Sequence, residues 1–230
     1  MLAFLIKRTA NAIFVMLSVS FIAFMIFRFV GDPVELMLNE QATQAQRDAL
    51  RDKLGLDDPF IVQFTTFVKN AAQGDFGISF RNQQDVLAMI AERFPATFEL
   101  VIVATLISLV VGIPLGVITA IHRQRWYAET LQFTSIIGIS LPSFVVGIGL
   151  ILIFSVWLGW FPAFGRGETV ELGSWSTGLL TPSGRLSIIL PALSLSLFQI
   201  TLVMRLVRAE MLEVLRTDFI KFARARGIPA

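Results

Sequence analysis

Four long stretches without a charged residue limit what this chain can fold into. They cover residues 9–27, 100–121, 130–165 and 186–204. A helix of about 20 apolar residues crosses the roughly 30 Å hydrocarbon core of a bilayer. The third stretch would be about 54 Å long as one helix. We therefore expect its span to end near Trp157 and Trp160, aromatic residues of the kind found at membrane interfaces.

These lengths predict an all-α polytopic membrane protein with four transmembrane helices, at about 9–29, 97–121, 131–158 and 187–207. The composition agrees, because 55% of the residues are hydrophobic and only 16% are charged, whereas about a quarter are charged in a soluble domain. The first helix follows Lys7 and Arg8 as a signal peptide would, but its apolar run exceeds the roughly 7–15 residues of a signal peptide. We expect a retained signal-anchor.

The basic residues predict an orientation in the membrane. Ten Lys and Arg fall in the 42 residues of segments 1–8, 122–129 and 205–230, and eight fall in the 85 residues of segments 31–95 and 166–185. Short loops rich in Lys and Arg stay on the cytoplasmic side. We therefore expect both termini in the cytoplasm and segment 31–95 outside.

The external segment 31–95 carries its own helix signals. Thr43 and Gln46 have capping-box spacing, and Gly55 can end the helix that follows. Asp58-Pro59 supplies an N-cap and a first-turn proline for a second helix, on which four apolar residues share one face, namely Phe60, Phe64, Phe67 and Ala71. These signals predict a small folded helical cap.

A third helix of this cap is expected from Asn82 to Phe94, with Pro95 ending it. Val86, Ile90 and Phe94 fall on one of its faces. Two interpretations of the apolar faces stay open: they pack against each other, or they form a docking surface for an external partner.

The last predicted cytoplasmic segment has the pattern of a short amphipathic helix. Thr217 can cap it and Gly227 can end it. Phe219 and Phe222 share a face with Ala223, and Lys221 and Arg224 lie elsewhere. A helix of about nine residues is not stable alone in water, so something must receive its apolar face. Either it lies on the bilayer surface or it fits a groove on a cytoplasmic partner.

Prolines and hydroxyls recur inside the predicted spans. A proline within a membrane helix frees a carbonyl, which is tolerated where protein or a water-lined cavity supplies a partner. Packing of small and hydroxyl-bearing residues between helices explains such positions most simply, and Gly112 and Gly116 form a packing pair of this type. A polar translocation path is the alternative, with candidate residues Ser140, Pro142, Ser143, Pro191, Ser194 and Thr201.

Several kinds of chemistry have no residues to support them in this sequence. It has no cysteine and one histidine, His122, in a predicted cytoplasmic turn. It has no HExxH motif, no GxxxxGK[ST] phosphate loop and no charge in the middle of a span. The net charge of +2 argues against nucleic acid. We predict no catalytic residue, no metal ligand and no cofactor, and an energy source outside this chain.

A family resemblance rests on short motifs spread over nearly the whole chain. They stand at 31–33 (GDP), 54–59 (LGLDDP), 74–79 (GDFGIS), 92–100 (ERFPATFEL), 112–116 (GIPLG), 140–144 (SLPSF), 158–162 (LGWFP) and 218–227 (DFIKFARARG). In this order the motifs resemble the integral-membrane permease subunits of ABC importers in the dipeptide, oligopeptide and nickel group.

The resemblance implies a role for the last motif. It is similar to the opening of the EAA loop, through which such permeases contact their ATPases. Ala223 and Gly227 match the loop's second alanine and its glycine, whereas Lys221 and Phe222 replace its Glu-Ala. The ATPase-coupling residues implied are Asp218, Phe219, Phe222, Ala223, Arg224, Ala225 and Gly227. The family pattern continues beyond this loop for about two more spans, so we expect either a truncated product or part of a longer chain, without the last two helices of the family fold.

The resemblance also implies partners and a domain order. The partners are a second permease subunit, two ATP-binding subunits and a periplasmic solute-binding protein, in the inner membrane. We expect a first transmembrane helix (1–30), a periplasmic helical cap (31–95), a three-helix permease core with a periplasmic loop at 159–186 (96–207), and a cytoplasmic coupling segment (208–230). The function expected is that of a permease subunit for peptides or similar small solutes. The alternative is a non-transporting membrane anchor that recruits a partner through its external cap.

Overall fold

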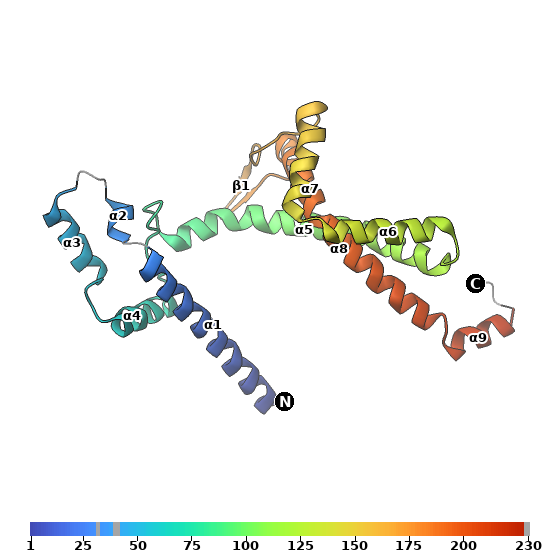
Figure 1. Ribbon diagram of the computed structural model, residues 1–230, viewed down its shortest axis with the longest axis horizontal. Coiled ribbons are helices and arrows are strands. Elements are labelled where there is room, and N and C mark those ends of the chain that lie inside the picture. The colour runs from blue at the N-terminus through green and yellow to red at the C-terminus, as the bar shows by residue number, and fades with distance from the viewer. Residues whose placement is uncertain (31–32, 39–41, 228–230) are drawn as a thin grey trace. The chain divides into compact units, whose positions relative to one another are not determined.

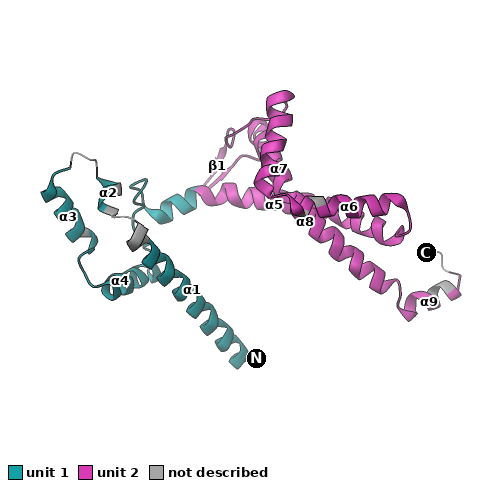
Figure 2. Ribbon diagram, in the orientation of Figure 1, with its two compact units in different colours: residues 1–92 teal, residues 93–230 magenta. Residues whose placement is uncertain are grey.

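The computed structural model describes residues 1–30, 33–38 and 42–227, without some side chains inside helices, among them those of Ala223 and Arg224. Gly31 and Asp32 of the first family motif lie outside the described residues. The chain divides into two compact units, Met1–Glu92 and Arg93–Ala230 (Figure 2).

Unit 1 begins with a long apolar helix and continues with short ones (Figure 1). Its helices are α1 (Leu2–Val30), α2 (Pro33–Met37), α3 (Gln44–Leu54) and α4 (Phe60–Ala72). The predicted capping box is confirmed, because Thr43 and Gln46 make both of its contacts at the start of α3. Gly55 ends α3 with a left-handed φ of 63°, as expected. The N-cap of α4 is Pro59, one residue later than predicted.

The phenylalanine face of α4 packs on α1. Phe60, Phe64 and Phe67 contact Phe21 and Phe24 of α1, with ring centroids 5.1–5.9 Å apart. Four of these five ring pairs meet edge to face, an arrangement that aromatic rings prefer. This face is therefore covered by the chain's own first helix.

The helix after the cap differs from the sequence prediction at both ends. α5 runs without a break from Val86 to Ile121, so Asn82 does not begin it and Pro95 does not end it. Gln83 has a φ of 54°, a left-handed value that is incompatible with an α-helix. The helix begins after Asp85, whose side chain accepts a hydrogen bond from the Ala88 N–H (2.8 Å), as an N-cap does. Pro95 removes one helical hydrogen bond, a loss that the remaining hydrogen bonds of a long apolar helix tolerate.

The predicted third span, 131–158, is not one helix. α6 (Trp126–Ser140) stops at Leu141, and α7 (Ser143–Leu150) begins after Pro142 and continues as the π-helical segment η1 (Ile151–Trp157). Figure 1 shows α6 and α7 running in different directions. Pro142 has no N–H and disfavours helical geometry at the residue before it. The expected end near Trp157 is confirmed.

Up to residue 227, where the description ends, the rest of unit 2 holds one more long helix, one short helix and a hairpin. α8 (Pro182–Val214) starts at Thr181, whose hydroxyl accepts from the Gly184 N–H, and α9 is Asp218–Ala225. Strands β1 (Val170–Leu172) and β2 (Trp175–Thr177) pair antiparallel, with Val170 opposite Thr177. The helical fold class is confirmed, but the sequence predicted no strand in the loop 159–186.

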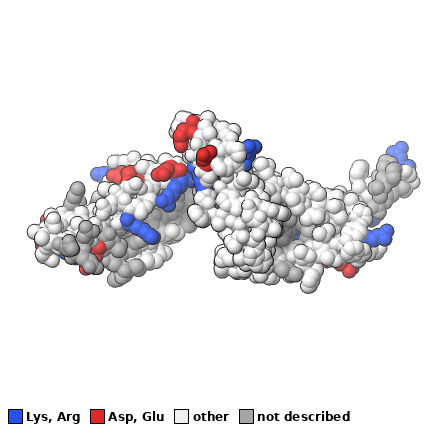
Figure 3. Space-filling model, turned by 90° about the horizontal axis from the view of Figure 1, so that it is seen from above, with Lys and Arg blue, Asp and Glu red and all other residues white. Residues whose placement is uncertain are grey.

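Three helices among the described residues are long and apolar enough to cross a membrane: Leu2–Ile26 within α1, Val86–Ile121 and Pro182–Val214. The fourth apolar segment, Ser143–Trp157, is shorter. On the face shown in Figure 3, a broad surface carries no Lys, Arg, Asp or Glu. Such a surface is what helices that lie in lipid require.

Close approach of α5 and α8 builds the interior of unit 2. A Cβ added at Gly112 would lie 3.0 Å from the Val203 Cβ, and one added at Gly116 would lie 2.7 Å from the Val207 Cβ. Both glycines are buried. The predicted packing role of this pair is confirmed.

Candidate functional site

A buried carboxylate holds the loop between α7 and α8 against α5. Glu99 is only 5% exposed. Its Oε1 accepts a hydrogen bond from the Trp175 indole N–H at 3.3 Å, and its Oε2 accepts one from the Gly178 N–H at 3.3 Å. The Arg166 guanidinium lies 3.4 Å from the same Oε2. A buried charge is expensive unless it is paired and hydrogen-bonded, and here both carboxylate oxygens have donors.

Arg166 links this carboxylate to the hairpin. Its Nη1 donates to the Ser176 Oγ (2.8 Å) and its Nη2 donates to the Ser176 carbonyl (2.5 Å). The rings of Phe94 and Phe98 on α5 meet the Trp175 ring edge to face, with centroids 6.1 and 5.5 Å away. Polar and aromatic contacts therefore fix the same strand, β2, on the same end of α5.

Glycines allow the loop to close on the start of α8. Gly167 has a φ of 73°, and a Cβ there would lie 2.6 Å from the Gly184 N. A Cβ at Gly184 would lie 2.2 Å from the Gly178 carbonyl oxygen. Thr181 Oγ1 donates to the Glu168 carbonyl (2.6 Å), and the Glu168 N–H donates to the Ser183 Oγ (3.0 Å). No side chain larger than hydrogen fits at Gly167 or Gly184.

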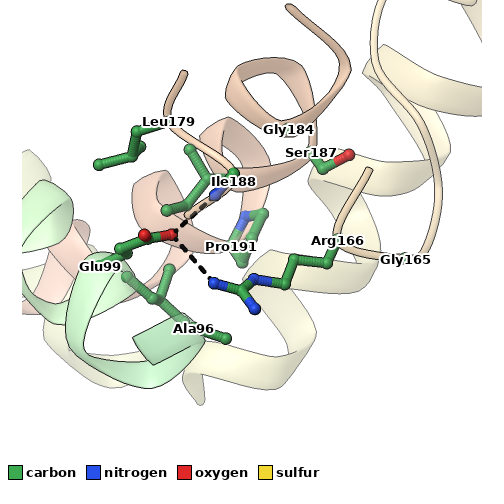
Figure 4. Close-up of a pocket in the computed structure, with 11 residues that line it drawn as sticks. Ala96, Glu99, Gly165, Arg166, Leu179, Gly184, Ser187, Ile188 and Pro191 are labelled. Atoms are coloured by element: carbon green, nitrogen blue, oxygen red, sulfur yellow. Dashed lines mark hydrogen bonds and ion pairs between the residues drawn. The ribbon is translucent and has the colours of Figure 1, made fainter. Parts of the chain in front are cut away.

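A cavity of about 190 Å³ lies beside the ion pair. Figure 4 shows Glu99 and Arg166 pointing toward each other at its edge, with Ile188 and Pro191 of α8 in its wall. The Arg166 Nε is buried without a hydrogen-bond partner within the described part of the chain. The cavity wall is mainly apolar, and every Glu99 oxygen is already bonded. The arrangement suits a structural anchor with a small apolar space beside it.

Sequence reasoning missed this anchor. In the sequence, Glu99 was noted only as part of the motif at 92–100. A carboxylate at the edge of a 22-residue uncharged stretch was the available signal, but its donors lie 67 to 79 residues away in the sequence. Only the folded loop brings them together.

The six candidate residues for a translocation path do not share one environment. Ser194 and Thr201 are buried in α8, whereas Ser140, Pro142, Ser143 and Pro191 are exposed. The Ser194 hydroxyl donates to the Ser143 carbonyl at 2.8 Å, across the break between α6 and α7. Thr201 donates to the Leu197 carbonyl of its own helix at 3.1 Å. The Ser194 hydroxyl therefore joins α8 to the start of α7, whereas the Thr201 hydroxyl bonds within α8.

The candidate coupling residues lie on α9 and the turn that follows. Phe219 and Phe222 are 76% and 63% exposed, and Arg226 lies over the Phe222 ring at 5.6 Å from its centroid. Asp218 forms an exposed ion pair with Lys221 at 2.9 Å. Ala225 is the last helical residue and is exposed, as is Gly227, which has the expected left-handed φ of 82°. The helical positions of Ala223 and Arg224 are described, but their side chains are not.

Thr217 does not cap α9 in the predicted way. Its hydroxyl donates backward to the Val214 carbonyl (2.7 Å), near the end of α8. The backbone carbonyl of Thr217 still accepts from the Lys221 N–H (3.2 Å). The residue therefore closes one helix with its side chain and opens the next with its backbone.

Within residues 1–30, 33–38 and 42–227, no three His, Asp or Glu side chains lie close enough together to hold a metal ion.

Comparison with known proteins identifies the family. The N-terminal family of binding-protein-dependent transport system membrane components matches residues 1–101, and the family of binding-protein-dependent transport system inner membrane components matches residues 112–230. The chain belongs to the permeases of binding-protein-dependent (ABC) importers. The resemblance found in the sequence motifs is thus confirmed, and these proteins are membrane permeases and not enzymes.

Individual relatives of the permease cover almost all of this chain. A Brucella abortus permease protein that is named for a peptide transport system is 39% identical over 230 residues, which are 99% of this chain and 70% of the relative. The oligopeptide transport system permease protein AppB of Bacillus subtilis is 37% identical, over 99% of this chain and 71% of its own length. The glutathione transport system permease protein GsiC of Shigella flexneri is 34% identical, with 99% and 70% covered.

Proposed function

We propose that the chain is a permease subunit of an ATP-driven importer of peptides or similar small solutes. The relatives named for peptide, oligopeptide and glutathione transport support this substrate class. The lack of an Asp, Glu or His in the middle of the uncharged stretches supports an external energy source. ATP hydrolysis is then assigned to two separate subunits, and solute capture to a periplasmic binding protein. A second permease subunit completes the pathway.

The observation that carries the proposal is the apolar face of α9, which stays largely exposed within the part of the chain that the structure describes. Two phenylalanine rings stand more than half exposed on a helix of eight residues. A helix this short is not stable by itself in water. We assign the covering groove to an ATPase subunit, because short amphipathic helices bind grooves through apolar anchors of this type. The orientation with the N-terminus and α9 in the cytoplasm, favoured by the Lys and Arg distribution, puts the anchors on the side where ATP is available.

The translocation path and the domain division belong to the same proposal. Four of the candidate residues are exposed. Three lie at the break between α6 and α7, namely Ser140, Pro142 and Ser143, and the fourth is Pro191, the proline inside α8. We assign these four residues to the lining of the translocation path. Ser194 and Thr201 are assigned to the packing of α8 against the break between α6 and α7. The domain division that we propose is 1–30, 31–95, 96–207 and 208–230, with 31–95 and 159–186 on the periplasmic side.

Binding of the ATPase by α9 variants tests the proposal. Phe222→Ala removes one apolar anchor, and loss of such an anchor costs about 2 kcal/mol or more, roughly a thirtyfold loss of affinity. The measurement is co-purification of the cognate ATPase subunits from solubilised membranes. The matched control is Lys221→Ala on the same helix, which removes only a weak exposed ion pair. We expect Phe222→Ala to lose the ATPase and Lys221→Ala to keep it.

The opposite pattern would assign α9 to the bilayer surface. A basic helix held by anionic lipid depends on its cations. If Phe222→Ala keeps the ATPase while the double variant Lys221→Ala, Arg224→Ala loses it, the groove-binding role of α9 is wrong.

A further inference from the structure

The α4 helix of the external segment has four sides, one of which lies opposite the phenylalanine face and is formed by Val62, Thr65 and Lys69. The phenylalanine face itself packs on α1. At 3.6 residues per turn, Ile61, Val68 and Ala72 lie along one flank of this face, and Gln63, Thr66 and Asn70 lie along the opposite flank. One flank is therefore apolar and the other polar. Ile61 is 62% exposed and Val68 is half-buried, so within the described residues the apolar flank is largely uncovered.

The contact with α1 fixes the depth of α4. Arg8 and Arg28 delimit the uncharged part of α1 and are twenty residues apart, which is about 30 Å of helix, the thickness of a hydrocarbon core. Phe24 and Phe21 lie four and seven residues before Arg28. Their positions are then roughly 6 and 10 Å inside the hydrocarbon boundary. The α4 rings that touch them reach the same depth.

The surface of α1 beside this contact is apolar and uncovered within the described residues. In its most apolar part no residue is buried, and Leu17, Ile22 and Met25 are exposed. Phe21 and Phe24 are half-buried, under α4. The uncovered flank of α4 continues this apolar surface at the depth at which amphipathic helices embed in a membrane, about 5–10 Å below the headgroup boundary.

We propose that α4 is an interfacial helix whose apolar flank (Ile61, Val68 and Ala72) contacts lipid acyl chains on the side of the membrane where α1 ends. The polar flank (Gln63, Thr66 and Asn70) faces water. On this flank, the Gln63 amide donates to the carbonyls of Leu56 and Asp58 (2.8 and 2.7 Å) and ties α4 to the loop before it. The segment between α1 and α5 is thereby partly a membrane element and not only a soluble cap. The inference rests on α1 crossing the membrane and is independent of the solute transported.

Spin labels at two matched positions of α4 test the proposal. The chain has no cysteine, so Ile61→Cys and Thr66→Cys each give a single labelling site on an exposed position of the same helix. The variants are labelled with a nitroxide in membrane vesicles, and collisions with oxygen, which partitions into lipid, are compared with collisions with a water-soluble nickel chelate. We expect the oxygen-to-nickel ratio to be severalfold higher at Ile61 than at Thr66.

Two results would overturn the proposal. Equal oxygen-to-nickel ratios at the two positions, or a higher ratio at Thr66, would show that the flank of Ile61 does not contact lipid. Strong nickel access at Ile61 that disappears only when the purified solute-binding protein is added would assign this flank to protein docking instead.

Discussion

At the scale of single residues, Glu99 carries more of the structure than its place in the sequence indicates. Its two oxygens accept hydrogen bonds from an indole N–H, a backbone N–H and a guanidinium, which come from three positions of one loop. Hydrogen bonds to a charged group are worth about 1.5–3 kcal/mol each, and a buried donor left unpaired costs about as much. Removing this one carboxylate therefore weakens the attachment of the loop to α5 and leaves the aromatic contacts of Trp175 in place.

We predict that Glu99→Gln loosens the loop. The side chain keeps its size, but its amide nitrogen replaces an acceptor and faces the Gly178 N–H and the Arg166 guanidinium. We expect the closed position of the loop to lose about 2 kcal/mol of stability relative to an open one, which is roughly a thirtyfold change in the equilibrium. A cysteine placed at Ser187 in the cavity wall should then react with N-ethylmaleimide roughly thirtyfold faster. Glu92→Gln, on an exposed position of the same helix, is the control and should leave the rate unchanged. Equal rates in all three backgrounds would show that Glu99 does not hold the loop.

At the scale of whole helices, the close packing of α5 against α8 requires glycine, which has no side-chain carbon, at the contact. Gly116→Ala would put its Cβ 2.7 Å from Val207 and 2.8 Å from the Met204 carbonyl oxygen, so one helix has to shift. Overpacking of this kind costs about 1–3 kcal/mol. We expect a lower thermal unfolding midpoint, followed by tryptophan fluorescence in detergent.

Gly149→Ala is the matched control for the helix contact. It lies in α7, and a Cβ there meets no atom within 4 Å, so alanine should leave the midpoint unchanged or raise it slightly through better helix propensity. If Gly116→Ala were as stable as the Gly149→Ala control, close approach of α5 and α8 would not be what this glycine provides.

Elements whose signals are local could be predicted from the sequence. The capping box of Thr43, the left-handed Gly55 and Gly227, and the existence of apolar helices all depend on neighbouring residues. The phenylalanine face of α4 was also predicted, but its partner on α1 lies about 40 residues away and was not. Thr181-Pro182 is a local helix start that was overlooked. Because of it, α8 begins at Pro182, five residues before the predicted start at 187.

Elements that depend on distant contacts were predicted wrongly or not at all. Pro142 was expected inside one long helix and instead separates α6 from α7, where Ser194 of α8 bonds the Ser143 carbonyl. Pro95 was expected to end a helix and lies buried inside one. A proline signals a lost hydrogen bond in both cases. Whether the helix then breaks is decided by what packs around it, and that is not in the local sequence.

At the scale of the whole molecule, the proposed topology makes a prediction about two exposed positions. Single cysteines at Gln73, after α4, and at Thr217, before α9, should lie on opposite sides of the membrane. In intact cells a membrane-impermeant maleimide should label only Gln73→Cys, and Thr217→Cys should react after permeabilisation. Labelling of both from outside, or of Thr217→Cys alone, would contradict the orientation.

Uptake of a labelled peptide tests the transport function most directly. Proteoliposomes are assembled from this chain, its cognate permease and ATPase subunits and its solute-binding protein. We predict peptide accumulation that requires both the binding protein and hydrolysable ATP, and that falls with Phe222→Ala but not with Lys221→Ala. Recruitment of the binding protein to the liposomes without any ATP-dependent uptake would contradict transport, and would assign the chain to membrane anchoring instead.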